Sequence, residues 1–135
     1  MPDTAAPAEL DDETRALLDR YVAAFEDYDI DRLTDLLHED AIQSMPPYSL
    51  WLRGRDDIFA WWLGPGVGCQ GSKLVPVGLV NGMPAWGQYK PDPTGGREPW
   101  ALIVPEVSDG RIVELTFFLD NKHLFPLFGL PDRLS

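Results

Sequence analysis

Two dipeptide turns in the second half of the sequence constrain its fold most strongly. Asn81-Gly82 and Asp109-Gly110 each lie between two runs that are rich in β-branched and aromatic residues. Dipeptides of this kind adopt the backbone conformation of tight hairpin turns, which join neighbouring antiparallel strands. A longer connection, PDPTGG, separates the middle two runs. The second half therefore predicts four antiparallel strands, at residues 72–80, 84–90, 99–107 and 111–119.

The first part of the sequence predicts helices. Asp11 or Asp12 is a suitable N-cap for a helix whose apolar residues recur at three- and four-residue spacing. The pattern breaks at Tyr28-Asp29, and a shorter helix capped by Asp29 or Asp31 follows. The apolar face of the first helix comprises Leu17, Leu18, Tyr21, Val22 and Phe25, and that of the second comprises Leu33, Leu36 and Leu37.

A proline corner and a third helix connect these helices to the four strands. Short strands are expected at residues 41–45 and 50–53, on either side of Pro46-Pro47. Asp56 is the expected cap of a helix that ends near Leu63. The glycine-rich residues 64–68 are expected to form neither helix nor strand. Helices followed by an antiparallel meander predict an α+β fold, with three helices packed on one face of a curved, mostly antiparallel sheet.

These elements account for one domain. Residues 10–135 have the length and apolar content of a single domain with a sizeable core. The first nine residues are rich in proline, alanine and acids, and they are expected to be flexible. The tail at residues 121–135 is apolar but interrupted by proline, so we expect it to lie against the rest of the domain as an ordered strap.

The charge and the cysteine content restrict the classes of function. A net charge of −11 without a cluster of lysine and arginine argues against direct binding of nucleic acid, which requires cations to neutralise phosphates. No run of about 18 apolar residues is present, and no membrane span is expected. With Cys69 as the single cysteine, neither a disulfide framework nor a cysteine-based zinc site is expected. A cytoplasmic protein is the resulting expectation.

Three segments together resemble the superfamily of SnoaL-like proteins and ketosteroid isomerases. They are RYVAAFEDYDIDRLTDLLHEDAIQSMPP at residues 20–47, WLRGRDDIFAWW at residues 51–62 and DGRIVELTFFLD at residues 109–120. The resemblance implies a cone-shaped α+β domain whose curved sheet wraps around an apolar pocket. Since dimerisation through the open face of the sheet is common in this superfamily, the resemblance also implies a homodimer.

A narrower resemblance includes the tail. The segments SMPPYSLWLRGRDDI, PWALIV and FFLDNKHLFPLFGLP are similar to the SnoaL-like domain at the C-terminus of a group of actinobacterial extracytoplasmic-function sigma factors. This similarity implies that sigma-factor domains or RNA polymerase are partners in a full-length context. The sequence is consistent both with one domain of such a factor and with a free-standing relative that uses the same scaffold.

The isomerase chemistry of the superfamily is not expected in this chain. That chemistry needs a carboxylate base, and an oxyanion hole made of a tyrosine and a protonated acid. Tyr21 matches the tyrosine, but Met45 stands where the resemblance places the base. The second acid belongs on the strand at residues 99–107. The expected inward residues of that strand are Trp100, Leu102 and Val104. Tyr21 is therefore interpreted first as a core or pocket residue and only second as a catalytic one.

Asp120 is the remaining candidate for catalysis. It ends an apolar strand at the position where SnoaL-type cyclases and similar epoxide hydrolases keep a catalytic carboxylate, so the resemblance implies that role. A carboxylate that faces an apolar cavity has its pKa raised by desolvation and can act as a general acid or base near neutral pH. The alternative is that Asp120 caps the turn at residues 121–123.

No metal and no other cofactor is expected. His38, Glu39 and Asp40 are consecutive and are expected at the end of a helix, where their side chains point in different directions. The second histidine, His123, is distant in the sequence, and the histidine spacing of a zinc site is absent.

Aromatic residues give the strongest indication of a ligand pocket. Five tryptophans are dense for a domain of this size, and an indole combines a large apolar surface with one N–H donor. The alternative is that these rings fill the core of the cone. The residues expected to line the pocket are Gln43, Met45, Tyr48, Trp51, Trp62, Trp86, Tyr89, Trp100 and Phe118.

Two functions follow from these expectations. The leading one is a domain that binds a small apolar or amphipathic molecule, or packs against partner domains, and so regulates rather than catalyses. The alternative is a small free-standing enzyme, similar to polyketide cyclases or epoxide hydrolases. In that case Asp120 is the general acid or base, and Tyr48 or Tyr21 orients the substrate.

Overall fold

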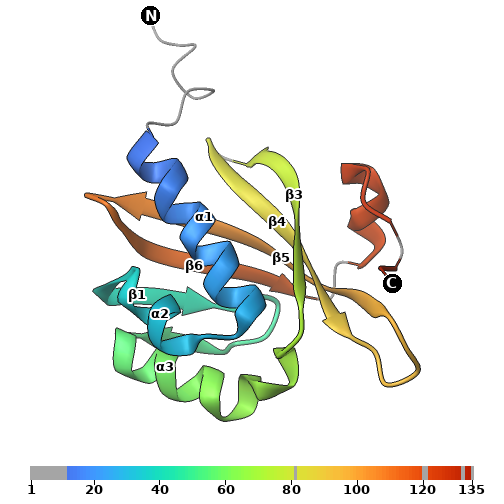
Figure 1. Cartoon of the computed structure of the whole chain (residues 1–135), viewed down its shortest axis with the longest axis horizontal. Coiled ribbons are helices and arrows are strands. Elements are labelled where there is room, and N and C mark those ends of the chain that lie inside the picture. The colour runs from blue at the N-terminus through green and yellow to red at the C-terminus, as the bar shows by residue number, and fades with distance from the viewer. Residues whose placement is uncertain (1–11, 81, 120–121, 132, 135) are drawn as a thin grey trace, which may run out of the picture.

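A six-stranded sheet divides the molecule into two sides (Figure 1). The computed structural model describes residues 12–80, 82–119, 122–131 and 133–134. The helices are α1 (Asp12–Asp27), α2 (Ile30–Asp35), α3 (Arg55–Leu63) and the 3-10 helices η2 (Pro65–Cys69) and η3 (Lys122–Phe128). The strands are β1 (Leu37–Ser44), β2 (Trp51–Arg53), β3 (Lys73–Val80), β4 (Met83–Pro91), β5 (Arg97–Ser108) and β6 (Arg111–Leu119). None of the described helices is long and apolar enough to cross a membrane.

The predicted α+β architecture is confirmed. The strands follow the order β2-β1-β6-β5-β4-β3, and all neighbours are antiparallel except β1 and β6, which are parallel. Asp109 and Gly110 have φ values of 51° and 75°, the positive values of a type I′ hairpin turn, and they join β5 to β6 as predicted. Gly82 lies between β3 and β4, whereas its predicted turn partner Asn81 lies outside the described residues.

Helix α1 buries its predicted apolar face, but the prediction for α2 was wrong at its end. Asp29 caps α2 by accepting a hydrogen bond from the backbone N–H of Arg32. Leu36 and Leu37 were expected to be helical. Instead, the Leu36 carbonyl accepts a hydrogen bond from the N–H of Ile112, and Leu37 begins β1 opposite Ile112. Pairing with β6, a strand far along the chain, therefore overrides the local helical spacing.

Two predictions around α3 were also wrong. The N-cap of α3 is Gly54, and Asp56 lies in the first turn of the helix. Residues 64–68 were expected to be irregular, but they lie within the 3-10 helix η2 or next to it. The hydroxyl oxygen of Tyr28 lies 2.7 Å from the Gly66 carbonyl oxygen. A long-range contact therefore holds this turn, and the local sequence does not reveal it.

The larger core lies between the helices and the sheet, and β5 enters it in a different register from the predicted one. Ala101 and Ile103 are buried in this core, and Ile103 is paired with the core residue Phe117. The predicted inward residues were Trp100, Leu102 and Val104. Of these, Leu102 and Val104 face the other side, because neighbouring residues of a strand point to opposite faces. The pairing with β4 shifts between Gln88 and Tyr89 and leaves Trp100 as the extra residue of β5, whose side chain packs at the margin of the core.

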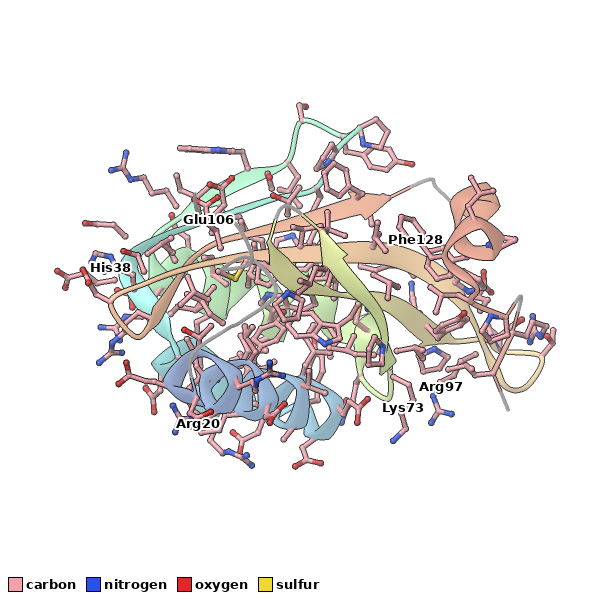
Figure 2. All side chains as sticks on the ribbon, turned by 90° about the horizontal axis from the view of Figure 1, so that it is seen from above. Arg20, His38, Lys73, Arg97, Glu106 and Phe128 are labelled. Carbon is pink, nitrogen blue, oxygen red and sulfur yellow. The ribbon has the colours of Figure 1, made fainter. Side chains whose placement is uncertain are left out.

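A second, smaller core lies on the outer face of the sheet, the face away from the helices. Phe125 and Leu130 are buried there against Tyr89 of β4. Gly87 permits this contact, since a Cβ at this position would lie 2.6 Å from Leu130 Cδ1. Figure 2 shows η3, with Phe128, on this side of the sheet, whereas α1 with Arg20 lies on the other side. Residues 125–131, here called the C-terminal segment, thus cover one end of the outer face.

Candidate functional site

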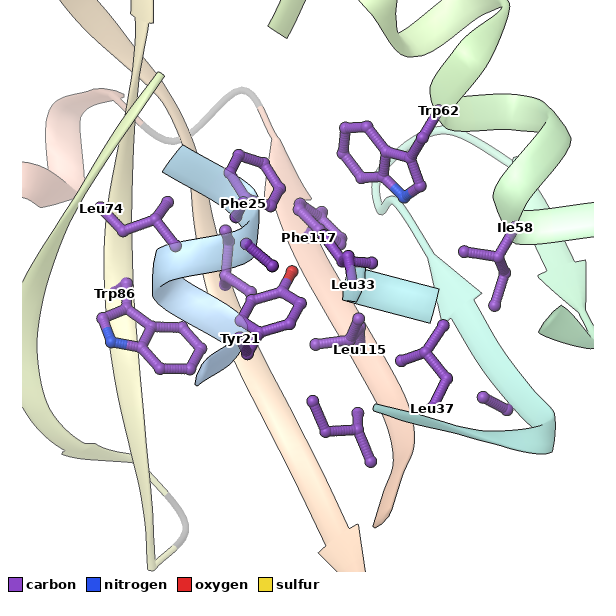
Figure 3. Packing of buried hydrophobic residues seen from close by; sticks show 14 of the residues in the cluster. Tyr21, Phe25, Leu33, Leu37, Ile58, Trp62, Leu74, Trp86, Leu115 and Phe117 are labelled. Atoms are coloured by element: carbon purple, nitrogen blue, oxygen red, sulfur yellow. The ribbon is translucent and has the colours of Figure 1, made fainter. Parts of the chain in front are cut away.

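A chain of aromatic rings occupies the space between the helices and the sheet (Figure 3). Tyr21 of α1 stacks on Trp86 of β4, with ring centroids 5.5 Å apart. Phe25 lies 5.9 Å from Tyr21 and makes an edge contact with Trp62 of α3 at 5.3 Å. Phe117 of β6 lies 5.4 Å from Trp62. All five side chains are at most 5% exposed, so the rings form a packed layer rather than the lining of an open cleft.

One end of this layer carries a buried amide. The indole N–H of Trp62 donates a hydrogen bond of 2.9 Å to Oε1 of Gln43, a β1 residue with no exposed surface. An indole N–H can only donate, so the Gln43 atom that it contacts must be the oxygen. The Nε2 atom of Gln43 therefore points elsewhere, and it has no hydrogen-bond partner among the described residues.

The other end carries a second buried amide. The Nε2 atom of Gln88 on β4 donates a 3.2 Å hydrogen bond to Oγ of Ser72, and that hydroxyl donates to the Cys69 carbonyl at 2.6 Å. This order of donors fixes the orientation of the amide and leaves Oε1 of Gln88 as the acceptor without a partner in the described chain. Gln88 lies two positions after Trp86, so both side chains point to the helix side of the sheet.

The hydroxyl of Tyr21 lies within the aromatic layer and is the third unpaired group. It is fully buried and has no partner within the described part of the protein. Desolvation raises the pKa of this phenol well above its usual value, and the nearby Cys69 raises it further. Burial also raises the pKa of the Cys69 thiol, although hydrogen bonding to Gln88 and the charge of Lys90 oppose this effect. Tyr21 therefore remains a neutral hydrogen-bond donor at physiological pH.

Tyr28 provides a comparison within the same core. Its hydroxyl oxygen lies 2.6 Å from the Trp62 carbonyl oxygen and 2.7 Å from that of Gly66, so its single proton is shared between two acceptors. Burial is the main cause of its raised pKa. The Tyr28 hydroxyl is thus hydrogen bonded, whereas the polar atoms of Tyr21, Gln43 and Gln88 have no partner among the described residues. A buried polar group without a partner costs about 1–3 kcal/mol, and such groups in folded proteins are normally satisfied by protein, water or ligand.

The structure brings together only part of the predicted pocket. Gln43, Met45, Trp62 and Trp86 are all buried on the helix side. Trp100 lies at the margin, where the Lys90 ammonium is 5.6 Å from the centre of its ring. Three further predicted residues are exposed: Tyr48 by 63%, Trp51 by 56% and Phe118 by 40%. The ninth, Tyr89, is buried on the outer face.

Of the two candidate catalytic residues, Tyr21 lies within the described part of the chain and Asp120 does not. Tyr21 lies inside the core as described above, and Met45, which stands where a base would be needed, is buried and apolar. Sequence reasoning missed Gln88, Ser72 and Tyr28. A polar residue two positions after a tryptophan in a strand was the available signal for Gln88.

The structure also corrects the location of the acidic triplet. His38, Glu39 and Asp40 lie on strand β1 and are exposed, not at a helix end. Among the described residues, no group of three or more histidine, cysteine and acidic side chains is placed to hold a metal ion. A depression of about 380 Å³ adjoins this region at the start of α3, and its lining is almost entirely charged: Glu39, Asp40, Arg53, Gly54, Arg55, Asp56 and Asp57.

Comparison with known proteins places these features in a family context. The model of the SnoaL-like domain family matches residues 18–115. The curated relatives include the ECF RNA polymerase sigma factor SigG of Mycobacterium tuberculosis, in strains H37Rv and CDC 1551, with 39% identity over 126 residues. The match covers 90% of this chain and 33% of those proteins, so the chain spans about a third of their length.

Solved structures share the fold at lower sequence identity. A Kribbella flavida protein provisionally assigned as a ketosteroid isomerase has a TM-score of 0.65 and 22% identity, covering 81% of this chain and 78% of that one. TerC, co-crystallised with polyporic acid, has a TM-score of 0.65 and 15% identity, with coverage of 87% and 98%. An NTF2-like protein of unknown function from Burkholderia pseudomallei has a TM-score of 0.67 and 14% identity, with coverage of 87% and 98%.

Proposed function

The chain belongs to the SnoaL-like domain family, and we propose that it binds a small apolar or amphipathic molecule between its helices and its sheet. In this proposal the chain is a regulatory accessory domain that acts in the cytoplasm and does not contact nucleic acid itself. The ligand carries a hydroxyl or carbonyl group on an apolar body. That chemistry matches two donors, Tyr21 Oη and Gln43 Nε2, and one acceptor, Gln88 Oε1, none of which has a partner among the described residues.

These three buried, unpaired atoms are the observation that carries the proposal. They border one continuous aromatic layer, with Gln43 attached to Trp62 at one end and Gln88 beside Trp86 at the other. A ligand inserted into this layer would gain apolar contacts from the rings and hydrogen bonds from atoms that lack a partner in the described part of the chain. Insertion requires the rings of the layer to separate, so the ligand would select a more open conformation than the packed one.

The relatives support a role in transcription for the longer proteins in which such a domain occurs. SigG is named as an RNA polymerase sigma factor, and this chain matches a third of it. In such a context the partners would be sigma-factor domains or RNA polymerase, and ligand binding would alter that contact. A homodimer through the outer face of the sheet is the alternative that the superfamily suggests for that surface, and sedimentation of the purified chain tests it.

A pair of probes that differ in one polar atom tests the ligand proposal. 2-Naphthol has a hydroxyl on an apolar body, and naphthalene has the body alone. We expect 2-naphthol to bind with a Kd of about 0.1 mM, as judged by quenching of tryptophan fluorescence, and naphthalene to bind at least about tenfold more weakly. Tyr21→Phe should reduce this difference. Equal affinity for both probes would contradict the assignment of the polar atoms, and binding of neither would contradict the proposal itself.

The second candidate function is an enzyme of the cyclase or epoxide-hydrolase type with Asp120 as general acid or base. The observation that favours it is the shared fold with a Xanthomonas campestris protein provisionally assigned as a polyketide cyclase, which has a TM-score of 0.61 and 19% identity over 86% of this chain and 96% of that one. The enzyme function would be established if the chain turned over an epoxide or a polyketide-like substrate and if Asp120→Asn abolished this turnover while the fold was retained. Turnover that survives this substitution would exclude the role of Asp120.

A further inference from the structure

No described element covers the part of the outer face of the sheet that lies beside the C-terminal segment. Register pairs place Trp51, Thr116 and Val104 in one row across strands β2, β6 and β5, with Ser44 of β1 between Trp51 and Thr116. Phe118 follows two residues after Thr116 on the same face. Trp51 is 56% exposed and Phe118 is 40% exposed. These residues, together with Glu106 and Glu114, are called the outer patch below.

The two glutamates of the outer patch form a like-charge pair. Glu106 of β5 and Glu114 of β6 are direct cross-strand partners. Like charges in this position destabilise a sheet. Neither carboxylate has an ion pair within the described residues, and Arg53, the basic residue in the same row, lies two strands away from Glu114. Figure 2 shows Glu106 on the side of the sheet opposite to α1 and Arg20.

A shallow depression joins this charged pair to the apolar residues. Its volume is about 170 Å³, and it is lined by Val80, Val104, Pro105, Glu106, Glu114, Thr116 and Phe118. An arginine side chain has matching chemistry, because its methylene stem can lie on apolar surface while its guanidinium contacts carboxylates. The exposed Phe118 ring lines the same depression, four residues along β6 from Glu114, and adds an apolar surface for neighbouring side chains of a partner.

We propose that the outer patch docks a basic amphipathic helix of a partner protein. A sheet buries both faces in a layered fold. Among the described elements, α1, α2 and α3 cover one face, whereas the C-terminal segment covers only one end of the other. A partner helix would supply the missing layer, with an arginine between Glu106 and Glu114 and apolar side chains on Trp51 and Phe118. The net charge of −11 opposes a second copy of this chain as the occupant, since it would bring two acidic surfaces together. The surface is separate from the ligand site and does not depend on it.

The test uses a fluorescein-labelled amphipathic peptide of about 18 residues, with leucines on one face flanked by arginines. Its binding to the full chain is followed by fluorescence anisotropy at about 150 mM salt, where long-range charge effects are screened. A peptide with glutamate in place of arginine is the control. We expect the basic peptide to bind and the acidic peptide not to bind.

Two pairs of matched variants locate the binding site. Glu106→Lys/Glu114→Lys should weaken binding at least about tenfold, as expected for loss of a central charged contact. Asp19→Lys/Asp35→Lys raises the net charge by the same amount at exposed positions on the helices and should change binding less than about twofold. Trp51→Ser should also weaken binding, whereas Leu63→Ser, at a residue with a similar exposure of 54%, should not.

Equal losses in the two charge-reversed variants would show non-specific attraction and overturn the proposal. So would equal effects of the Trp51 and Leu63 substitutions, or a stable dimer in sedimentation that Glu106→Lys/Glu114→Lys disrupts. Circular dichroism confirms that each variant is folded before binding is compared.

Discussion

Replacing two buried tyrosines by phenylalanine should change stability in opposite directions. Tyr21→Phe removes a hydroxyl that is fully buried and has no partner in the described protein, while the ring keeps its contacts with Trp86 at 5.5 Å and Phe25 at 5.9 Å. Burial of an unpaired hydroxyl costs about 1–3 kcal/mol. We take the low end and expect the free energy of unfolding to increase by about 1 kcal/mol.

Tyr28→Phe removes a hydroxyl that is hydrogen bonded. Its oxygen lies 2.6 Å and 2.7 Å from two backbone carbonyls, of Trp62 and Gly66, which would lose their partner. We expect the free energy of unfolding to decrease by about 1–2 kcal/mol. Because the two substitutions delete the same atom from the same residue type, changes in the unfolded state cancel in the comparison.

Urea unfolding followed by tryptophan fluorescence measures both effects. A change of about 1 kcal/mol corresponds to a midpoint shift of about 0.5 M urea and to roughly 3–5 °C in Tm for a chain of this size. The Tyr21→Phe midpoint should rise and the Tyr28→Phe midpoint should fall. If Tyr21→Phe lowered stability by 1 kcal/mol or more, its hydroxyl would be making an internal hydrogen bond, and the reasoning about unpaired atoms would be refuted.

Three further predictions concern single contacts. Gln43→Leu should lower the free energy of unfolding by about 1–3 kcal/mol, because it leaves the indole N–H of Trp62 without its acceptor. An unchanged urea midpoint would contradict a stabilising role for this hydrogen bond. Gly87→Leu should displace the C-terminal segment, and limited proteolysis should then cleave this segment faster than in the unaltered chain. Equal cleavage rates would show that the close contact between Gly87 and Leu130 is unimportant. The pKa of Asp92 is lowered mainly by hydrogen bonds from the backbone and side chain of Thr94, and then by Arg133. The stabilisation that the ionised Asp92 provides is therefore present above the usual carboxyl pKa of about 4, and it is lost as pH falls through the lowered value. Asp92→Asn should therefore reduce the loss of stability between pH 6 and pH 3, and an equal loss in both proteins would contradict the assignment.

Local signals in the sequence accounted for the parts of the fold that local physics determines. The Asp109-Gly110 turn forms as expected because its positive φ values suit these residues. The apolar spacing of α1 likewise defines its buried face. Contacts between distant segments were not predictable in this way. The parallel pairing of β1 with β6 converts Leu37 from helix to strand, and a bulge at Trp100 of β5 changes the direction of that side chain.

The candidate site, too, was predicted from the sequence only in part. Tryptophan content indicated where bulk would gather, and Trp62 and Trp86 do lie together in one aromatic layer. The sequence did not separate these from Trp51, which is on an exposed short strand, or from Tyr89, which belongs to the second core. Strand alternation assigns a residue to one of two faces, but only the register decides which face meets the helices.

The side-chain amides of glutamine provide the most direct test of the ligand site. The chain contains three glutamines, of which Gln43 and Gln88 are buried and Gln70 is exposed. A titration of 2-naphthol into the ¹⁵N-labelled protein, followed by NMR of the side-chain amide signals, reports on each of them. The ligand proposal predicts that the signals of Gln43 and Gln88 shift with one shared Kd and that the signal of Gln70 stays in place. Shifts confined to Gln70, or no shift at saturating probe, would contradict it.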